Sequence, residues 1–262
     1  MRNSFLYKNT QIHYAESGKG SAVVLLHGFL ENSSMWNQVS QELSKRNRVI
    51  CIDLLGHGQT GNLGYIHTME DQAQMVKAVL THLRLRKQVL VGHSMGGYVA
   101  LSFTKLFPES VKGLCLMNST ALPDSEEKKI NRDRAIKAVK QNPKTFIKIA
   151  IPMLFSEKNR EILNEEIELI TQEALQITHQ GIIAALEGMK IRKNQISIYK
   201  TANFPVLMIV GKQDPALDYE SLISQTKNTK VKVIEFPDGH MSHIENKDSL
   251  IKNLAIFIKD CQ

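Results

Sequence analysis

The chain has 262 residues, of which 42% are apolar and 23% are charged, and this balance excludes an intrinsically disordered protein. Its length suits one sizeable core, or a core with an inserted subdomain. The formal net charge is +7, but the basic residues are interspersed with acidic ones, so we expect no nucleic-acid partner.

Targeting and redox signals are sparse. The N-terminal segment lacks the apolar run of a secretory signal, and no apolar run approaches the length of a membrane-spanning helix. The three cysteines, Cys51, Cys115 and Cys261, are few and odd in number, which argues against a disulfide framework. Together these features predict a protein of the reducing cytoplasm.

The first half of the chain alternates between strand and helix patterns. Residues 1–17 alternate apolar and polar side chains around a polar turn at 8–11, which predicts a β-hairpin. The strands expected next are 22–28, 48–54, 87–93 and 111–118, with helices at 36–46, 68–85 and 95–108 between them. Strands that are apolar throughout are covered on both faces, so the pattern predicts a parallel sheet between helices.

A helical segment then interrupts this rhythm. From about residue 119 to 202 the pattern is helical and rich in charge. Strands are expected again at 205–211 and 231–237, each followed by a helix, at 219–227 and 247–260. We therefore predict one α/β core from residues 1–120 and 203–262, with a helical cap of residues 121–202 inserted after strand 6.

A serine stands among glycines where an expected strand meets an expected helix. Gly92-His93-Ser94-Met95-Gly96 has the G-x-S-x-G spacing of a nucleophile elbow. Such a tight turn strains the serine backbone by about 1–3 kcal/mol and exposes its hydroxyl. The Met95 amide, at a helix N-terminus, could donate to a developing oxyanion. The alternative is a glycine-rich turn that only packs closely or binds phosphate, although the G-x-G-x-x-G spacing is absent.

A nucleophilic serine needs a base and an acid. His240 follows the last strand on a loop, at the edge where parallel sheets form their sites, and His243 is the nearest alternative. Asp214 follows another buried strand and is the expected partner of the imidazole. Asp218 is expected to cap a helix, and Asp238 is too close in sequence to His240 to brace its ring.

A second oxyanion donor is expected from the turn after residues 22–28. His27-Gly28-Phe29 ends that strand, and its turn faces the serine if strands 22–28 and 87–93 are neighbours. The Phe29 amide is then the natural second donor. His27 is expected to shape this loop rather than to react.

Five segments together resemble the α/β-hydrolase fold superfamily, and most of all its serine esterases and lipases with a helical cap. They are "HGFLENSSMW", "DLLGHGQT", "VGHSMGGYVAL", "VGKQDPAL" and "DGHMSHIENKD". The resemblance covers the core and implies a mostly parallel eight-stranded sheet with helices on both faces. It implies Ser94 as nucleophile, Asp214 as acid and His240 as base, with the Phe29 and Met95 amides holding the oxyanion.

Two details qualify this resemblance. In the loop that starts at Asp53, Leu55 and Thr60 stand where the family commonly has proline and serine. We interpret this loop as structural and the changes as mild. Serine at position 94 disfavours the members with an aspartate nucleophile, the haloalkane dehalogenases and epoxide hydrolases.

The cap composition bears on the substrate. Phe29, Met153, Phe155 and Met189 are candidates for lining a pocket, and the many Met and Ile residues favour a small-molecule apolar or acyl substrate. No clustered ligand pattern predicts a metal site, and no cofactor is required. The sequence gives no indication of the oligomeric state.

We therefore expect a serine hydrolase that cleaves the carboxylic ester of a small or medium apolar acid through an acyl-enzyme. The same triad could instead serve C–C bond cleavage, a thioesterase or lactonase reaction, or a lyase step in menaquinone synthesis. A cap arginine such as Arg132, Arg134 or Arg192 that pointed into the pocket would favour an anionic substrate. A hypothesis from another class is a ligand-binding or signalling protein on a hydrolase scaffold.

Overall fold

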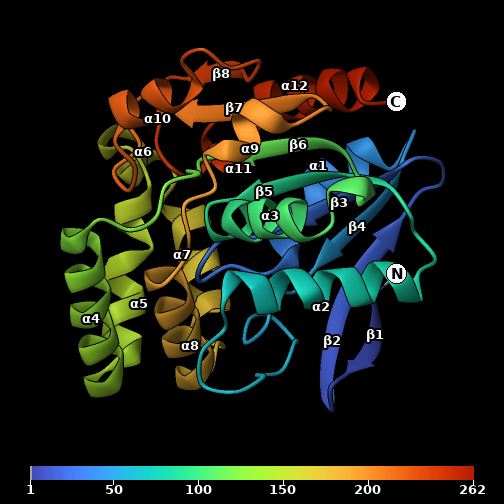
Figure 1. Cartoon of the computed structure of the whole chain (residues 1–262). Coiled ribbons are helices and arrows are strands. Elements are labelled where there is room, and N and C mark those ends of the chain that lie inside the picture. The colour runs from blue at the N-terminus through green and yellow to red at the C-terminus, as the bar shows by residue number, and fades with distance from the viewer. Residues whose placement is uncertain (1) are drawn as a thin grey trace.

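The computed structural model describes residues 2–262, whose strands form one eight-stranded sheet (Figure 1). The strands are β1 (Arg2–Tyr7), β2 (Thr10–Ser17), β3 (Ala22–Leu26), β4 (Arg48–Ile52), β5 (Gln88–His93), β6 (Val111–Met117), β7 (Val206–Gly211) and β8 (Lys232–Phe236). Their spatial order is β1-β2-β4-β3-β5-β6-β7-β8. Strand β2 pairs antiparallel with β1 and β4, and all the other neighbours pair in parallel. The predicted mostly parallel eight-stranded α/β sheet is confirmed.

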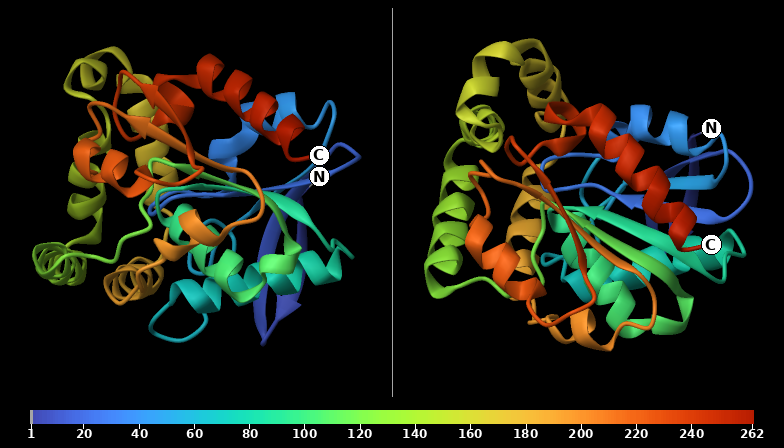
Figure 2. Two further views of the ribbon diagram at one scale, coloured as in Figure 1. Left: turned by 45° about the horizontal axis from the view of Figure 1, so that its top comes forward. Right: turned by 90° about the horizontal axis from the view of Figure 1, so that it is seen from above.

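Helices cover both faces of the sheet, as Figure 2 shows from two sides. The helices outside the segment between β6 and β7 are η1 (Ser33–Trp36), α1 (Asn37–Leu43), α2 (Met69–His82), α3 (Met95–Leu106), η2 (Pro108–Ser110), α10 (Tyr219–Thr226), α11 (Ser242–Glu245) and α12 (Lys247–Asp260). Alternate side chains of a strand point to opposite faces. On β3, Val23 and Leu25 pack in one core cluster with residues of α1 and α12, and Val24 and Leu26 pack in the other with residues of α2 and α3.

The chain between β6 and β7 is helical, as predicted from its pattern. These helices are α4 (Glu126–Gln141), α5 (Pro143–Ala150), η3 (Pro152–Leu154), α6 (Glu157–Ile162), α7 (Asn164–Ala174), α8 (His179–Lys190) and α9 (Ser197–Thr201). Pro143 and Pro152 each begin a helix, a position at which no amide hydrogen bond is lost. The boundaries of a separate cap at 121–202 stay a prediction.

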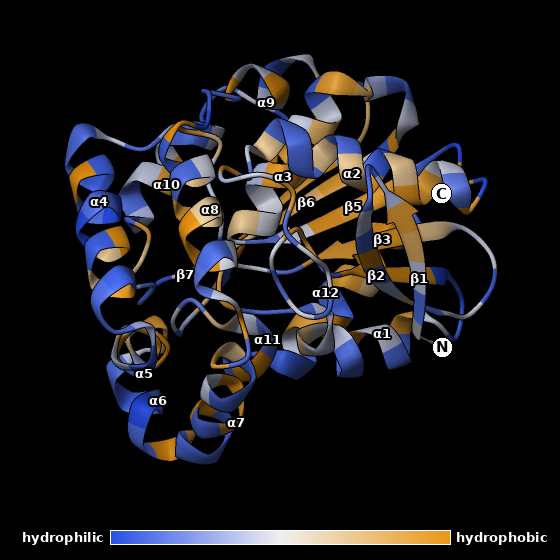
Figure 3. Ribbon diagram, turned by 90° about the horizontal axis from the view of Figure 1, so that it is seen from below, coloured by the Kyte–Doolittle hydropathy of each residue, from blue (hydrophilic) through white to orange (hydrophobic). Residues whose placement is uncertain are grey.

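Helices α4, α5, α7 and α8 lie beyond the carboxyl ends of the central strands (Figure 1). Figure 3 shows the hydrophobic strands flanked by helices, and α4 and α6 made mostly of hydrophilic residues. Their position closes the end of the sheet at which the loops after β3, β5, β7 and β8 meet. Within residues 2–262 no helix is both long and apolar enough to cross a membrane.

Candidate active site

Ser94 occupies the turn between β5 and α3 in a strained conformation, with φ 48° and ψ −114°. A Cβ atom on Gly92 would overlap the Gly96 carbonyl oxygen, and one on Gly96 would overlap the backbone of Leu26. Only glycine therefore fits at these two positions, as the pattern predicted. The Ser94 amide donates to the Met117 carbonyl over 2.9 Å, which ties the strained turn to the neighbouring strand β6.

His240 and Asp214 form a buried hydrogen-bonded pair on the loops after β8 and β7. The Nδ1 atom of His240 lies 2.7 Å from Oδ2 of Asp214. Burial alone raises the pKa of the Asp214 carboxyl, but the His240 charge and hydrogen bonds from His240, Asn118 and the Ala216 amide bring the net pKa below its usual value. Because an ionised carboxylate only accepts hydrogen bonds, Nδ1 carries the proton and donates it. The other ring nitrogen, Nε2, is left as the basic atom.

Ser94 and His240 line the same cavity, which has a volume of about 340 Å³. Within residues 2–262 the Ser94 hydroxyl makes no hydrogen bond, with His240 or with any other residue. Contacts between a nucleophile and its base often tighten only when a substrate is bound. The cavity is mostly apolar, and its walls come from the loops after β3, β5 and β7 and from α3, α4, α5 and α8.

The residues predicted to line the pocket divide into two pairs. Phe29 and Met189 line the cavity with Ser94. Met153 and Phe155 do not line it, and the structure corrects the expectation for them. Met153 is 52% exposed, and Phe155 is wholly buried in the main core. The intervening residue Leu154 lines the cavity instead, because the tight 3₁₀ turn of η3 aims successive side chains in different directions.

Two backbone amides beside Ser94 have no hydrogen-bond partner among the described residues. They belong to Met95, at the first turn of α3, and to Phe29, in the turn after β3. Strands β3 and β5 are parallel neighbours, with Leu26 paired to Gly92, so both turns leave the sheet side by side. An amide at a helix N-terminus and a second amide from an adjacent loop can hold one oxyanion between them.

His27 and Asp53 shape the loops around this site, as expected. His27 Nε2 accepts from the Leu54 amide over 2.8 Å, and its Nδ1 donates to the Gly28 carbonyl over 2.8 Å. Burial holds the pKa of His27 below its usual value, so this imidazole is neutral. The Asp53 carboxylate accepts from the amides of Ser33 and Gln59. These bonds fix the turn after β3 against the loop after β4.

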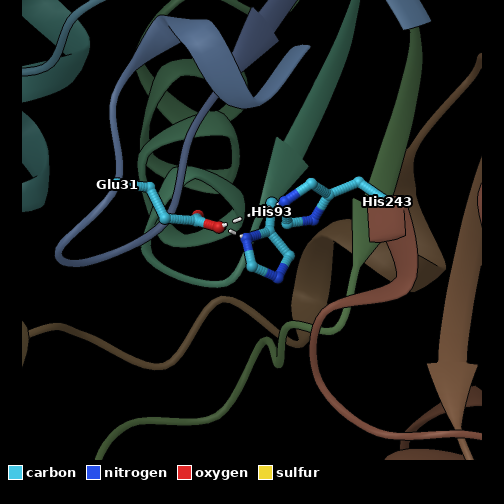
Figure 4. A group of neighbouring side chains, drawn as sticks. All are labelled: Glu31, His93 and His243. Atoms are coloured by element: carbon cyan, nitrogen blue, oxygen red, sulfur yellow. Dashed lines mark hydrogen bonds and ion pairs between the residues drawn. The ribbon is translucent and has the colours of Figure 1, made fainter. Parts of the chain in front are cut away.

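Glu31, His93 and His243 form a buried cluster that sequence reasoning did not identify (Figure 4). Glu31 Oε2 accepts from the Gly28 amide over 2.6 Å and lies 2.7 Å from His93 Nδ1. His93 Nε2 lies 3.0 Å from the His240 carbonyl oxygen. A carboxylate and a carbonyl are both acceptors, so both nitrogens of His93 carry protons and the ring is an imidazolium.

The electrostatics of the cluster agree with this assignment. Burial raises the pKa of Glu31, but the His93 charge and hydrogen bond outweigh it and the pKa is about 2. Burial lowers the pKa of His93, and the Glu31 carboxylate more than offsets this, so the net pKa is raised. His243 Nε2 lies 3.7 Å from Glu31 Oε1, and burial lowers its pKa to about 4, so this ring is neutral.

The three residues of the cluster offer donor atoms within 4.8 Å of one another, so we tested them as a metal site. Two ligands at about 2.0–2.1 Å from a tetrahedral zinc ion lie roughly 3.3 Å apart. Glu31 Oε2 and His93 Nδ1 are 2.7 Å apart, which is the distance of a charge-assisted hydrogen bond. The arrangement therefore fits a charge-assisted hydrogen bond better than a pair of ligands on one zinc ion.

Comparison with known proteins identifies the family. Residues 21–247 match the family model described as the alpha/beta hydrolase fold. A thermophilic esterase from Thermogutta terrifontis is 30% identical, with a TM-score of 0.89 over 100% of this chain and 99% of that one. The enol-lactonase from Burkholderia xenovorans LB400 shares the fold at 20% identity, with a TM-score of 0.90 over 98% of this chain and 100% of that one.

Curated proteins are similar to this chain as well. A putative 2-succinyl-6-hydroxy-2,4-cyclohexadiene-1-carboxylate synthase from Bacillus subtilis is 30% identical over 268 residues, 94% of this chain and 95% of the relative. Proteins from Mycobacterium tuberculosis and Mycobacterium bovis are 38% identical over 103 residues, which is 30% of their length. The family model covers most of the chain, and we conclude that this protein belongs to the α/β-hydrolase fold family of enzymes.

Proposed function

We propose that this protein is a serine hydrolase that cleaves the carboxylic ester of a small or medium apolar acid. The observation that carries the proposal is the 2.7 Å hydrogen bond between His240 and Asp214, at a cavity that His240 shares with the strained Ser94. An oriented imidazole in the same cavity as a serine hydroxyl is the arrangement that can activate a serine for attack on a carbonyl.

In the proposed acylation step, Ser94 Oγ bonds to the ester carbonyl carbon and its proton passes to Nε2 of His240. The carbonyl oxygen becomes an oxyanion, which the free amides of Phe29 and Met95 stabilise. The Asp214 carboxylate holds the imidazole in the required tautomer and stabilises its positive charge. When the carbon–oxygen bond to the alcohol breaks, His240 returns the proton to the departing alcohol.

Deacylation repeats the same steps with water in place of the serine. His240 takes a proton from water, the resulting hydroxide attacks the acyl carbon, and Ser94 leaves as the protonated serine. A cavity of about 340 Å³ with walls that include Phe146, Leu186 and Met189 suits an acyl chain of modest length. The similarity to the esterase, which covers both chains almost completely, supports the ester as the bond that is broken.

A lyase or C–C bond reaction on the same three residues is the second candidate. The 30% identity to the putative synthase over nearly all of both chains favours it. In the lyase reaction His240 would abstract a proton from the substrate and no acyl-enzyme would form. Acylation of Ser94 therefore distinguishes the proposed ester hydrolysis from the lyase reaction.

The test measures hydrolysis of 4-nitrophenyl butanoate and the intact mass of the protein after a short reaction. We expect turnover by the wild type, a butanoyl adduct on Ser94, and a loss of at least about a thousandfold in kcat/KM for Ser94→Ala. The matched control is Ser249→Ala, on the exposed surface of α12, which should keep full activity. Undiminished turnover by a folded Ser94→Ala variant would remove the proposal.

A further inference from the structure

We propose that the natural substrate carries a carboxylate, which binds to Lys128, Asn131 and Arg132 of α4 while its ester group lies at Ser94. This inference deepens the proposed function and rests on it. Residues 128, 131 and 132 are spaced i, i+3 and i+4, so they lie on one face of the helix. All three line the cavity that Ser94 and His240 also line.

The side chains that line this cavity include positive charges and no negative charge. Its described lining residues include Lys128 and Arg132 but no aspartate or glutamate. Lys128 makes no ion pair with residues 2–262, and within them its Nζ donates one hydrogen bond, to the Ala216 carbonyl oxygen over 3.4 Å. An anionic group that entered would meet attraction from this wall and no acidic repulsion.

The carboxylate of Asp124 forms ion pairs with two guanidinium groups, those of Arg132 and Arg192. The buried Asp124 accepts from Arg132 Nε over 2.7 Å and from Arg192 Nη1 over 2.5 Å. Two positive charges against one negative charge leave an excess of one positive charge. Arg192 lies over the ring of Tyr98, 4.1 Å from its centre, and Tyr98 also lines the cavity. Asp124 thus fixes both arginines in place but does not neutralise both.

Lys128, Asn131 and Arg132 of α4 offer hydrogen-bond donors that are still unpaired within residues 2–262. Arg132 uses Nε on Asp124, and its two terminal nitrogens make no hydrogen bond within the described chain. Asn131 Oδ1 accepts from Arg134, so its side-chain amide turns donors toward other partners. A guanidinium, an ammonium and an amide group together suit the two oxygens of a carboxylate.

The rest of the cavity lining is largely apolar, and in the proposed complex it would lie between the carboxylate at α4 and the ester group at Ser94. Phe146, Ala150, Leu154, Leu186 and Met189 line the same cavity. A methylene chain between the carboxylate and the ester would lie against them. The carboxylate could belong to the acid half of the ester, as in a half-ester of a dicarboxylic acid, or to its alcohol half. Both substrates have the same chemistry at α4.

Matched pairs of substrates test the proposal. The first pair is mono-4-nitrophenyl adipate against its methyl-capped diester, which places the charge on the acid half. The second is 4-carboxyphenyl butanoate against its methyl ester, which places the charge on the alcohol half. Because the wall is partly exposed, we expect kcat/KM to favour the charged member of one pair by about three- to tenfold. Equal rates or a preference for the neutral member in both pairs would overturn the proposal.

Variants of α4 test whether a preference for the charged substrate arises from this helix. Lys128→Gln should reduce the ratio of charged to neutral kcat/KM, and Lys128→Glu should reverse it. Lys137→Gln is the control, because Lys137 is an exposed cation on the opposite side of α4 and does not line the cavity. The ratio should also fall as NaCl is raised, since salt screens a partly exposed ion pair. A ratio that Lys128→Glu leaves unchanged would contradict the assignment.

A binding experiment separates this inference from the proposed function. Adipate and its dimethyl ester are titrated into the wild type and the Lys128→Glu variant by calorimetry. Binding of adipate that is tighter than binding of the diester, and that Lys128→Glu weakens, supports the carboxylate site even if no ester is hydrolysed. If the protein hydrolyses neutral esters but binds adipate no more tightly than its dimethyl ester, the carboxylate site is refuted and the proposed function still stands.

Discussion

Glu31 and His93 are joined by a buried ion pair of 2.7 Å that connects three loops of the candidate active site. Glu31 comes from the turn after β3 and also accepts from the Gly28 amide, which precedes Phe29. His93 directly precedes Ser94, and its other nitrogen donates to the His240 carbonyl. One pair of charges thus holds the turn after β3, the serine turn and the histidine loop at fixed separations.

The first prediction concerns the stability that this pair provides. Glu31→Gln keeps the shape of the side chain but leaves the His93 imidazolium buried without a counter-charge. Removing one partner of a buried pair typically costs about 3–5 kcal/mol, and we expect a loss near the lower end because the amide oxygen can still accept. Urea unfolding measures the loss. The control is Glu161→Gln, on the exposed surface of α6, which should unfold within about 0.5 kcal/mol of the wild type.

The second prediction concerns acid pH and two neutral histidines. Burial lowers the pKa of His57 to about 3 and that of His243 to about 4, whereas an unfolded histidine titrates near 6.5. Between these values the unfolded chain binds more protons than the folded one, so stability falls as the pH decreases from about 6.5 toward 4. Glu31, with a pKa of about 2, adds a further loss below about pH 4.3.

Urea unfolding at pH values between 4 and 7.5 measures this dependence. The raised pKa of His93 acts in the opposite sense, because its stabilisation is complete below about pH 6.5 and is lost as the pH rises through the folded-state pKa. We therefore expect a maximum of stability near neutral pH with a steep acid side. A free energy of unfolding that stays constant from pH 4 to 6.5 would contradict the buried neutral state of His57 and His243.

The sequence was informative where a local pattern has only one structural solution. The strand–turn–helix with Gly92 and Gly96 could be predicted because no larger side chain fits there, and the continuous apolar runs between helical patterns predicted the sheet. The proximity of Asp214 and His240 followed from their loops, which leave neighbouring strands at the same edge.

Other features depend on contacts that a sequence pattern does not encode. Glu31 and His93 are separated by 62 positions, and no local spacing indicates that a charged pair forms between them. The exposure of Met153 and the burial of Phe155 depend on the rotation of one 3₁₀ turn against the core. In a turn as short as η3, a shift of the helical pattern by one residue decides which side chain faces the cavity.

The third prediction concerns Gly92, the first glycine of the serine turn. In Gly92→Ala the new methyl group would overlap backbone atoms of Gly96 and Gly97, which cannot move without shifting α3. We expect a loss of more than about 3 kcal/mol in unfolding free energy, or insoluble protein, because overpacking against a fixed backbone cannot relax. The control is Gly61→Ala, whose Cβ would meet the Thr10 methyl group at 3.0 Å and the Gln11 carbonyl oxygen at 3.9 Å, so that a shift of a few tenths of an ångström in one side chain accommodates it. A Gly92→Ala variant as stable as Gly61→Ala would show that the turn is less constrained than we describe.

The last prediction assigns Asp214 its role in orienting His240. Asp214→Asn keeps the size of the side chain but can donate to Nδ1, which favours the tautomer with its proton on Nε2, where a base is needed. We expect kcat to fall by about 10³–10⁴-fold, with a much smaller change in KM, since the substrate cavity is untouched. Asp238→Asn is the control: this aspartate precedes the same histidine by two residues, and within residues 2–262 its side chain makes no hydrogen bond. Equal losses of kcat in the two variants would mean that the 2.7 Å contact between Asp214 and His240 serves only to stabilise the loops.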